Sequence, residues 1–255
     1  GLGCGGERRG GRACRASVPA GEGGGSAFAA IVAGGSGRAG IEMLDRLAMA
    51  AAKAATGVDW PDVGAVLLMD VDGPLEEVEH TSEQASRMCF AAGAIEVRRP
   101  KDEDERAILW KGRRSAFAAV GRISPNYVVQ DGVIPRSEIA RVLGDIEALS
   151  KQSGLRIANV FHAGDGNLHP LVLYDVKIPG QEKLAEDVAG EILRICLRFG
   201  GSITGEHGVG ADKAPYMAEL FTEDDLETMS RLRCSCDPTA QCNPGTILPT
   251  PRPGA

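Results

Sequence analysis

The sequence predicts an α+β fold, in which helices cover one face of an antiparallel or mixed sheet. From Gly40 onward, apolar runs typical of strands alternate with stretches of helical spacing. A short Gly/Asp-rich turn between His162 and His169 joins two strand-like runs directly. Such a turn requires an antiparallel pair, because parallel strands need a crossover of about a dozen residues. With 255 residues and 43% hydrophobic composition, the chain is long enough to bury a sizeable core.

The individual elements follow from composition and end signals. Residues 41–56 are rich in Ala, Leu and Met and favour a helix, and the apolar run 63–71 favours a buried strand. Asp102 suits the N-cap of a helix over 102–120. On the same kinds of signal, further helices are predicted at 75–92, 137–153, 182–199, 213–220 and 223–233, and strands at 94–98, 127–134, 156–162, 168–175 and 202–204.

The two ends of the chain differ from its middle. Glycine is dense in residues 1–37, and a segment so rich in glycine loses too much backbone entropy on ordering to form a packed element. We expect disorder over most of it, although the apolar run 27–33 has the composition of a short piece of helix. The predicted division is a disordered 1–37, a folded domain over 38–249 and a tail over 250–255. The start lacks both an initiator Met and the order of a secretory signal, which indicates a fragment.

Charge and cysteine content narrow the class of protein. The net charge of −7 argues against a nucleic-acid partner, since proteins that bind nucleic acids are usually basic. No run approaches the ~18 consecutive apolar residues of a membrane span. The seven cysteines are odd in number and irregularly spaced, so they indicate neither a disulfide framework nor a metal site. A cytoplasmic location is the simplest expectation from this pattern.

Three of the four histidines lie in two Gly-flanked turns, His162 and His169 in the first and His207 in the second. Residues near the turn of an antiparallel pair lie about 5 Å apart, close enough for His162 and His169 to share one metal ion. Glu206 is the candidate third ligand, and this set suits Zn²⁺, Mn²⁺ or Fe²⁺. His207 would then lie beside the metal as a general base. Alternatively, the first run is only a turn, or 205–210 is a phosphate-binding loop.

A basic cluster on the helix predicted over 102–120 also has two interpretations. It comprises Lys111, Arg113 and Arg114, and the spacing alone favours a solvated helix face. The sharper alternative is that one guanidinium enters the pocket and grips a carboxylate in bidentate fashion. The run 131–135, by contrast, is interpreted as the end of a strand followed by a turn.

Six runs carry a resemblance to a known family: AGIEMLDRLA (39–48), LWKGRRSAFAAVGRISPNY (109–127), DGVIPR (131–136), NVFHAGDGNLHPL (159–171), GGSITGEHGVG (200–210) and CDPTAQCNPGTILP (236–249). In this order they resemble the C-terminal half of the FAD-linked oxidases of the vanillyl-alcohol oxidase superfamily. That group includes the FAD-binding subunit of glycolate oxidase and the D-lactate and D-2-hydroxyglutarate dehydrogenases. The resemblance covers about residues 40–249.

The resemblance implies a ferredoxin-like α+β cap domain followed by a small helical tail. It also implies flavin-dependent oxidation of a small 2-hydroxy acid, glycolate or D-lactate, to the 2-oxo acid, with FAD as cofactor. The family's N-terminal FAD-binding domain has no counterpart in this sequence. We therefore expect the chain alone to bind FAD poorly and to act only with an FAD-binding domain or with other oxidase subunits. The alternative is a non-catalytic remnant, or a metal-binding module without turnover.

The resemblance also implies roles for single residues. In metal-dependent members, the residues that match His162, His169 and Glu206 hold a divalent ion, which chelates the hydroxyl and carboxylate of the substrate. The residue that matches His207 takes the hydroxyl proton while hydride passes to the flavin. The residue that matches Arg113 binds the substrate carboxylate.

Near the end of the chain, an Asn-Pro-Gly run carries one further implied role. Asn243 matches a residue that lies near the flavin in the family, so it is the candidate cofactor-binding residue. Thr246, however, stands where the family usually has Lys, and this departure weakens a phosphate or flavin contact there.

Overall fold

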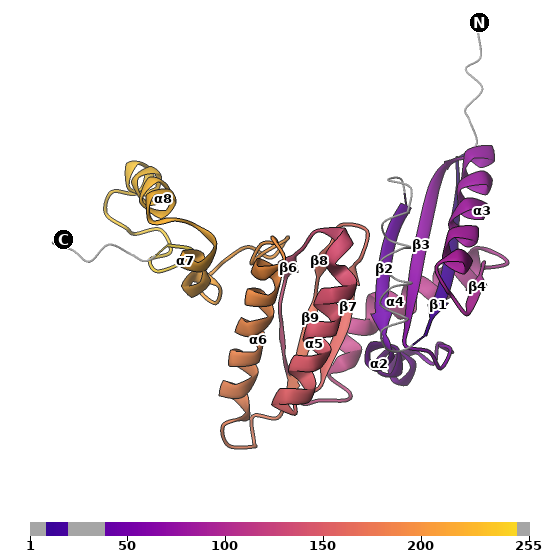
Figure 1. The fold of residues 1–255 in the computed structure, drawn as a ribbon, viewed down its shortest axis with the longest axis horizontal. Helices are drawn as coiled ribbons and strands as arrows, with labels where there is room; N and C mark the ends of the chain where they lie inside the picture. The colour runs from indigo at the N-terminus through magenta and orange to yellow at the C-terminus, as the bar shows by residue number, and fades with distance from the viewer. Residues whose placement is uncertain (1–8, 20–38, 249–255) are drawn as a thin grey trace, which may run out of the picture.

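The computed structural model describes residues 9–19 and 39–248 of the chain. Its centre is a nine-stranded sheet with the order β4-β1-β3-β2-β7-β8-β6, to which β9 is added through β7 and β5 through β9. Two groups of helices and a C-terminal helical segment complete the fold (Figure 1). Every pairing between these strands is antiparallel, so the predicted α+β class is confirmed.

The first part of the chain builds one half of the sheet. Its strands are β1 (Arg9–Val18), β2 (Ala39–Asp45), β3 (Ala65–Pro74) and β4 (Glu96–Arg98). Its described helices are α2 (Arg46–Thr56), α3 (Leu75–Ala91) and α4 (Glu103–Val120).

The second part builds the other half and the C-terminal segment. Its strands are β5 (Asn126–Val129), β6 (Gly132–Val133), β7 (Ile157–His162), β8 (Asn167–Leu168) and β9 (Pro170–Tyr174). Its helices are α5 (Ile139–Ser153), α6 (Gln181–Arg198), α7 (Met217–Leu220) and α8 (Glu223–Cys236). The helices predicted at 75–92, 102–120, 137–153 and 182–199 are confirmed to within two residues at either end.

The expectation of disorder is wrong for Arg9–Val18, which forms β1. This strand pairs along its whole length with β3 and, over Arg15–Ser17, also with β4, so strand pairing satisfies much of its backbone. The small side chains of Cys14 and Ala16 are buried in the core. Tertiary pairing and burial therefore outweigh the weak intrinsic preference of a Gly-rich segment. Residues 1–8 and 20–37, with the suggested helical piece at 27–33, lie outside the described residues, as does the predicted tail.

The helix predicted over 41–56 begins later, because 39–45 forms β2. In this strand Ile41 and Met43 face one core cluster, while Leu44 faces the other. Asp45 then ends the strand and caps α2, since its carboxylate accepts a hydrogen bond from the Ala48 N–H at 2.8 Å. The alternating pattern of residues 41–44, directly before an N-cap residue, indicates a strand. Helix propensity alone did not reveal it.

Three predicted strands are divided or shortened in the structure. The strand predicted over 127–134 is divided into β5 and β6, with Gln130 and Asp131 between them. The strand predicted over 168–175 is divided into β8 and β9 at His169. Of 202–204, only Ser202 pairs, through an isolated bridge to Val133. In each case the chain leaves the ladder next to the residues that form the candidate site.

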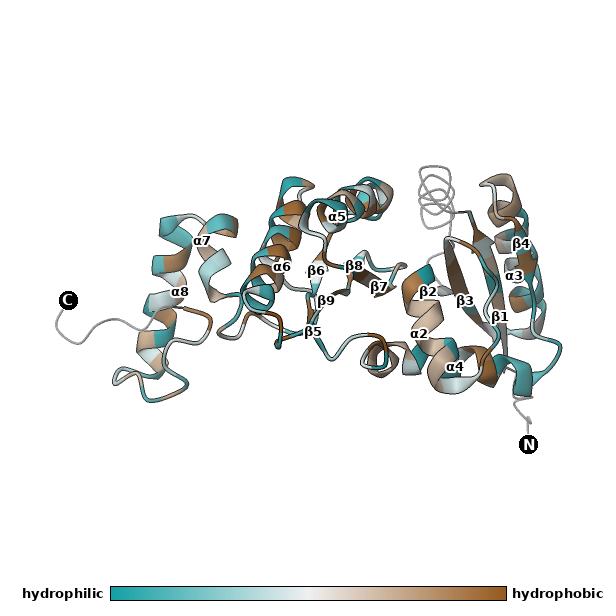
Figure 2. Cartoon of the chain, turned by 90° about the horizontal axis from the view of Figure 1, so that it is seen from below, coloured by the Kyte–Doolittle hydropathy of each residue, from teal (hydrophilic) through white to brown (hydrophobic). Residues whose placement is uncertain are grey.

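Helices cover both faces of the sheet, where the sequence predicted one covered face. Side chains of α3, α5 and α6 pack in one core cluster with alternate residues of β2, β3 and β7. The intervening residues of the same strands pack in a second cluster with α2 and α4 (Figure 2). The central strands are apolar on both sides, so each face requires its own helical cover.

The C-terminal segment forms a small helical unit beside α6, as the resemblance implied. It packs against α6 through a third core cluster, which contains Leu193 of α6 together with Ile203, Met217 and Leu248. Figure 1 shows α7 and α8 at the far end of the molecule from β1. No helix in the described part of the chain is both long and apolar enough to cross a membrane.

The glycine-rich turn after α6 is held against the sheet by Asp131, which is fully buried between β5 and β6. Its carboxylate accepts hydrogen bonds from the Thr204 hydroxyl at 2.8 Å and from the backbone N–H groups of Gly205 and His207 at 2.9 Å. Lys213 donates to the Asp131 carbonyl at 2.9 Å and to its carboxylate at 3.2 Å. Burial alone would raise the pKa of Asp131, but these donors outweigh it and hold the pKa well below its ordinary value.

The first prediction concerns the packing of α4 against Trp60, in the loop that follows α2. A Cβ atom at Gly112 would lie 2.6 Å from Cζ2 of the buried Trp60, so Gly112→Ala should lower the free energy of unfolding by about 1–3 kcal/mol. Urea denaturation of the purified chain measures this. The matched control is Gly144→Ala in α5, where a Cβ meets nothing within 4 Å and helix propensity should add about 0.5–1 kcal/mol. Equal stability of the two variants would contradict the packing account.

The second prediction concerns the buried pair of Asp131 and Lys213. Asp131→Asn leaves the ammonium uncompensated and should lower the free energy of unfolding by about 3–5 kcal/mol at pH 7. Because the folded pKa is depressed, the stabilisation is present above the unfolded value of 3.8 and is lost as pH falls below it. Urea denaturation across pH in the presence of EDTA should therefore show a flatter acid limb for Asp131→Asn. Parallel acid limbs for the two proteins would refute this assignment.

Candidate functional site

The candidate site lies on the face of the sheet that α4 covers. On β7, His162 follows Val160 by two residues and therefore shares its face, which belongs to the cluster with α2 and α4. Across the ladder, His162 is the register partner of Glu42 on β2. The two side chains meet, with His162 Nδ1 at 2.8 Å from Glu42 Oε1.

The strands on either side of the turn between His162 and His169 are antiparallel, as predicted. Their register, however, does not place the two histidines directly opposite each other. His162 pairs with Asn167, so His169 is its diagonal neighbour two residues further along. Two residues along a strand return to the same face. The rings therefore still meet, edge to face, with centroids 5.4 Å apart. His169 is 1% exposed, whereas His162 is partly exposed.

The second glycine-rich turn brings Glu206 and His207 to the two histidines. Glu206 Oε1 lies 3.0 Å from His169 Nε2, 3.6 Å from His162 Nε2 and 3.9 Å from His207 Nε2. The His207 ring stacks on the His169 ring with centroids 5.0 Å apart. All four residues predicted from the two turns are thus gathered around one carboxylate oxygen.

Close backbone approach explains why this meeting requires glycine. A Cβ at Gly205 would lie 2.5 Å from Oδ1 of Asn167, so the two turns touch at this point. Gly166 has a φ of +71°, and a Cβ there would lie 2.2 Å from the carbonyl oxygen of Ile134. The glycines let the two turns pack against each other and against the chain that follows β6.

The basic residues of α4 divide between solvent and site. Lys111 and Arg114 are exposed, as the solvated-face interpretation predicts, but Arg113 is only 6% exposed. Its guanidinium donates to Glu42 Oε2 from Nη2 at 2.7 Å and from Nε at 3.2 Å. It also lies over the Phe117 ring at 5.7 Å from the centroid. The spacing of the basic residues therefore did not predict that Arg113, unlike Lys111 and Arg114, enters the site.

These side chains line an open pocket of about 320 Å³. The lining combines the predicted residues with an apolar wall from α4 and β5, and consists of Arg113, Phe117, Val129, His162, His169, Glu206 and His207. Phe117 also contacts His169, edge to face, with ring centroids 5.6 Å apart. One side of the pocket is therefore apolar and the other carries nitrogen and oxygen donors, a composition typical of a site for a small polar ligand.

Electrostatics favour the neutral form of the central histidine. Burial lowers the pKa of His169, and the neighbouring His162 and His207 act in the same direction, against the opposing charges of Asp131 and Glu206. A neutral imidazole is the form that binds a metal. His169 Nδ1 lies 4.0 Å from Asp131 Oδ1 and has no hydrogen-bond partner among the described residues.

The donor set fits a divalent metal ion. One ligand atom from each of His162, His169 and Glu206 lies within 4.8 Å of the others. A second group with the same property shares His169 and adds Asp131 and His207. Asp131, however, is already committed to the backbone of the turn and to Lys213. The first group is therefore the better candidate, with three protein ligands and a side open to the pocket.

Besides the apolar lining residues Phe117 and Val129, two charged residues at the site were not predicted from the sequence. Glu42 lies in β2, where the sequence predicts helix, and Asp131 lies in a run that the sequence predicts to be the end of a strand followed by a turn. A sequence signal existed in each case, since Glu42 and Asp131 are charged residues set among apolar ones. An isolated charge inside an apolar run is expensive to bury, so it usually has a partner.

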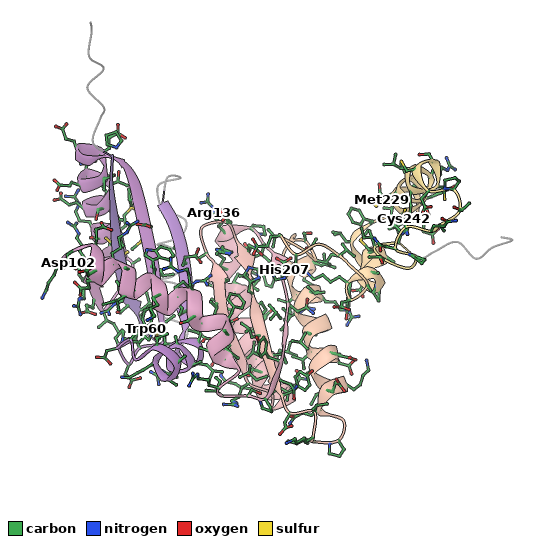
Figure 3. All side chains as sticks on the ribbon, turned by 180° about the vertical axis from the view of Figure 1, so that it is seen from behind. Trp60, Asp102, Arg136, His207, Met229 and Cys242 are labelled. Carbon is green, nitrogen blue, oxygen red and sulfur yellow. The ribbon has the colours of Figure 1, made fainter. Side chains whose placement is uncertain are left out.

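The predicted cofactor residue Asn243 lies elsewhere. It belongs to the C-terminal segment, adopts a positive φ of 46°, and its carbonyl accepts a hydrogen bond from Arg233. Its neighbour Cys242 is far from His207 (Figure 3). Asn243 is thus not brought to the pocket, and its role stays a prediction.

The cysteines of the described residues are all free thiols, three buried and three exposed, and Cys4 lies outside the described part.

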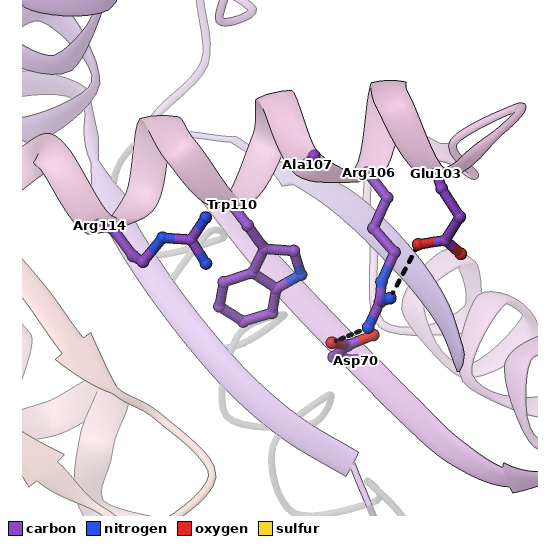
Figure 4. A pocket seen from close by; sticks show the side chains of 6 residues that line it. All are labelled: Asp70, Glu103, Arg106, Ala107, Trp110 and Arg114. Atoms are coloured by element: carbon purple, nitrogen blue, oxygen red, sulfur yellow. Dashed lines mark hydrogen bonds and ion pairs between the residues drawn. The ribbon is translucent and has the colours of Figure 1, made fainter. Parts of the chain in front are cut away.

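A second hollow, of about 390 Å³, lies between α4 and β3 (Figure 4). It is lined by Asp70, Glu103, Arg106, Ala107, Trp110 and Arg114. Arg106 already donates to Asp70 at 2.6 Å and to Glu103 at 3.1 Å. No histidine lines it, and neither metal-donor group of the described residues includes its carboxylates. Among the described residues, both metal-donor groups therefore lie at the smaller pocket.

Comparisons with known proteins agree with this fold. The family model described as FAD linked oxidases, C-terminal domain, matches residues 12–247. This range starts inside β1, well before the domain start predicted at residue 38. The matched range thus assigns part of the Gly-rich segment to the folded domain.

Curated relatives match over most of this chain. Glycolate oxidase subunit GlcD of Escherichia coli K12 is 43% identical over 240 residues, which cover 94% of this chain and 48% of that protein. The GlcD subunit of Bacillus subtilis 168 is 36% identical and covers 72% and 39%, respectively. The mitochondrial D-lactate dehydrogenase (cytochrome) of Arabidopsis thaliana is 25% identical and covers 82% and 37%. The chain spans less than half the length of these relatives.

Solved structures share the fold at low identity. The 4-ethylphenol oxidase of Gulosibacter chungangensis matches with a TM-score of 0.70 at 16% identity, over 95% of this chain and 54% of that one. A p-cresol methylhydroxylase matches with a TM-score of 0.70 at 12% identity, over 94% and 53%. With a family match that spans nearly all described residues, this chain belongs to the FAD-linked oxidases, of which it carries the C-terminal domain.

Proposed function

We propose that this chain forms the substrate- and metal-binding part of a flavin-dependent dehydrogenase or oxidase that converts glycolate or D-lactate to the 2-oxo acid. The observation that carries the proposal is the convergence of donor atoms from His162, His169 and Glu206 beside the buried Arg113 in one open pocket. The names of the relatives, glycolate oxidase subunit and D-lactate dehydrogenase, support the substrate class. FAD would be held mainly by a domain outside these 255 residues.

The metal would be held by His162 Nε2, His169 Nε2 and Glu206. Two imidazole nitrogens and one carboxylate oxygen suit Zn²⁺, Mn²⁺ or Fe²⁺. The burial of His169 fits this role, because it favours the neutral imidazole. When bound, a divalent cation lowers the pKa of a coordinated hydroxyl and fixes its orientation.

Arg113 would bind the carboxylate of the substrate. Its side chain is 7% exposed and borders the pocket between Phe117 and the histidines. A guanidinium can donate a charge-assisted hydrogen bond to a carboxylate from the nitrogen that Glu42 leaves free. The substrate would then lie with its carboxylate towards α4 and its hydroxyl towards the histidines, while Phe117 and Val129 exclude water from the apolar side.

His207 would accept the proton of the substrate hydroxyl. Its ring is fixed by stacking on His169, and its Nε2 lies 3.9 Å from the Glu206 oxygen around which the donor atoms gather. A histidine next to the reacting oxygen is a suitable general base, and a flavin accepts the hydride in this class of reaction. His207 is partly exposed, which leaves a route for the proton to solvent.

The third prediction tests the metal ligands. The purified chain should bind one divalent ion, and His162→Ala and Glu206→Ala should each lower the affinity by more than about 100-fold, because loss of an outer-sphere contact alone costs about 10–100-fold. Isothermal titration with Zn²⁺ and with Mn²⁺ measures both quantities. His80→Ala is the matched control, since His80 is the histidine on the exposed side of α3, outside the pocket. If both ligand variants bind as much metal as the parent, the ligand set is wrong.

The fourth prediction tests the general base. The chain should reduce a dye with glycolate or D-lactate only after fusion to an FAD-binding domain from a glycolate oxidase relative. In that fusion, His207→Ala should lower kcat by about 10²–10⁴-fold and leave the metal bound. Turnover assays and metal analysis on the same samples separate the two effects.

Three outcomes of the fusion experiment are informative. Unchanged turnover in His207→Ala would remove His207 from the mechanism. A fusion that binds metal and FAD but never turns over would favour the non-catalytic metal-binding module. Stoichiometric flavin absorbance in the purified chain alone would contradict the proposal that another domain supplies the main FAD contacts.

A further inference from the structure

One carboxylate joins the two halves of the proposed chemistry. Glu42 on β2 takes a different partner on each oxygen, with Oε1 at 2.8 Å from His162 Nδ1 and Oε2 at 2.7 Å from Arg113 Nη2. The proposed metal ligand and the proposed substrate-binding residue are therefore bridged by a side chain that is not among the metal-donor groups of the described residues.

The contact is built into the fold. Glu42 and His162 are register partners on adjacent strands, which fixes their side chains on the same face of the sheet. The Glu42 side chain is 14% exposed and that of Arg113 is 7% exposed, so both are largely withdrawn from water. A buried ion pair is seldom more stabilising than apolar side chains of the same volume. The arrangement is therefore better explained by what it positions than by its contribution to stability.

For His162, the contact selects one tautomer. A carboxylate accepts hydrogen bonds, so Glu42 places the hydrogen of His162 on Nδ1. The lone pair is then on Nε2, the nitrogen that lies 3.6 Å from Glu206 Oε1. A histidine that donates its other N–H to a carboxylate is oriented and made more basic as a metal ligand.

For Arg113, the contact leaves part of the guanidinium free. Glu42 accepts from Nη2 and Nε, which form one edge of the group. Within the described part of the chain, no residue is hydrogen-bonded to Nη1. The occupied edge fixes the plane of the guanidinium, and Nη1 remains as a donor for a ligand carboxylate in the pocket.

We propose that Glu42 is a positioning residue that sets the His162 tautomer and the Arg113 orientation together. This inference rests on the proposed function for the identity of the two partners. It makes the geometry of the metal ligand and of the substrate-binding residue depend on the same strand, β2. Loss of Glu42 should therefore disturb both at once, although Glu42 itself contacts neither metal nor substrate.

The fifth prediction uses the purified chain without FAD or substrate. Imidazole ¹⁵N NMR should show the hydrogen of His162 on Nδ1 in the parent, and a mixture of tautomers in Glu42→Ala. With Co²⁺ as the probe metal, Glu42→Ala should bind about 10–100-fold more weakly and with an altered visible absorption spectrum. Glu42→Gln retains an acceptor without the charge, so it should keep the tautomer and lie between the other two in affinity.

The matched control is Glu219→Ala, which removes an Arg–Glu pair of similar geometry from Arg194 on α6. It should leave both the His162 tautomer and the Co²⁺ affinity unchanged. A Glu42→Ala variant with the parent tautomer and the parent Co²⁺ affinity would overturn the inference. If the parent binds no metal at all, the metal part of the proposed function fails, and the tautomer measurement still decides the role of Glu42.

Discussion

The buried carboxylate of Asp131 is the contact on which the candidate site depends. The backbone of the turn that carries Glu206 and His207 is tied to the sheet by an isolated bridge at Ser202 and by the hydrogen bonds that Asp131 accepts. Lys213 compensates the charge of Asp131, so the pair can remain in the interior. A flexible glycine-rich sequence is thereby fixed to a rigid sheet. The backbone freedom that lets the two turns pack closely would otherwise leave Glu206 and His207 without a defined position.

Two of the three carboxylates at the site are paired with a cationic side chain, and the third is not. Asp131 is paired with Lys213, and Glu42 is paired with Arg113. Glu206, whose side chain is about half exposed, is the carboxylate that faces three imidazoles without a fixed cation. A divalent cation at this point would reverse the local charge and attract a small carboxylate. This charge arrangement supports the proposal that a metal and an anionic ligand bind together in the pocket.

The sequence revealed the parts of the site that are local and missed the parts that depend on tertiary contacts. His162, His169, Glu206 and His207 stand out because histidine is rare here and both turns are rich in glycine. The partner of Glu42, however, became recognisable only once β2 was placed beside β7, since Glu42 and His162 are 120 residues apart in the sequence. Arg9–Val18 escaped for a related reason, because its order comes from the neighbouring strands β3 and β4. The bounds of the long helices were predicted to within two residues, because the capping residues and apolar spacing that indicate a helix lie within or next to each segment.

We propose that a divalent ion is held between the two turns. Anomalous diffraction from crystals of the chain grown with Mn²⁺ or Zn²⁺ would locate such an ion. One strong peak is expected within about 2.0–2.2 Å of His162 Nε2, His169 Nε2 and a Glu206 oxygen. A peak bound by other residues, or its absence from this pocket at a saturating concentration of both metals, would contradict it.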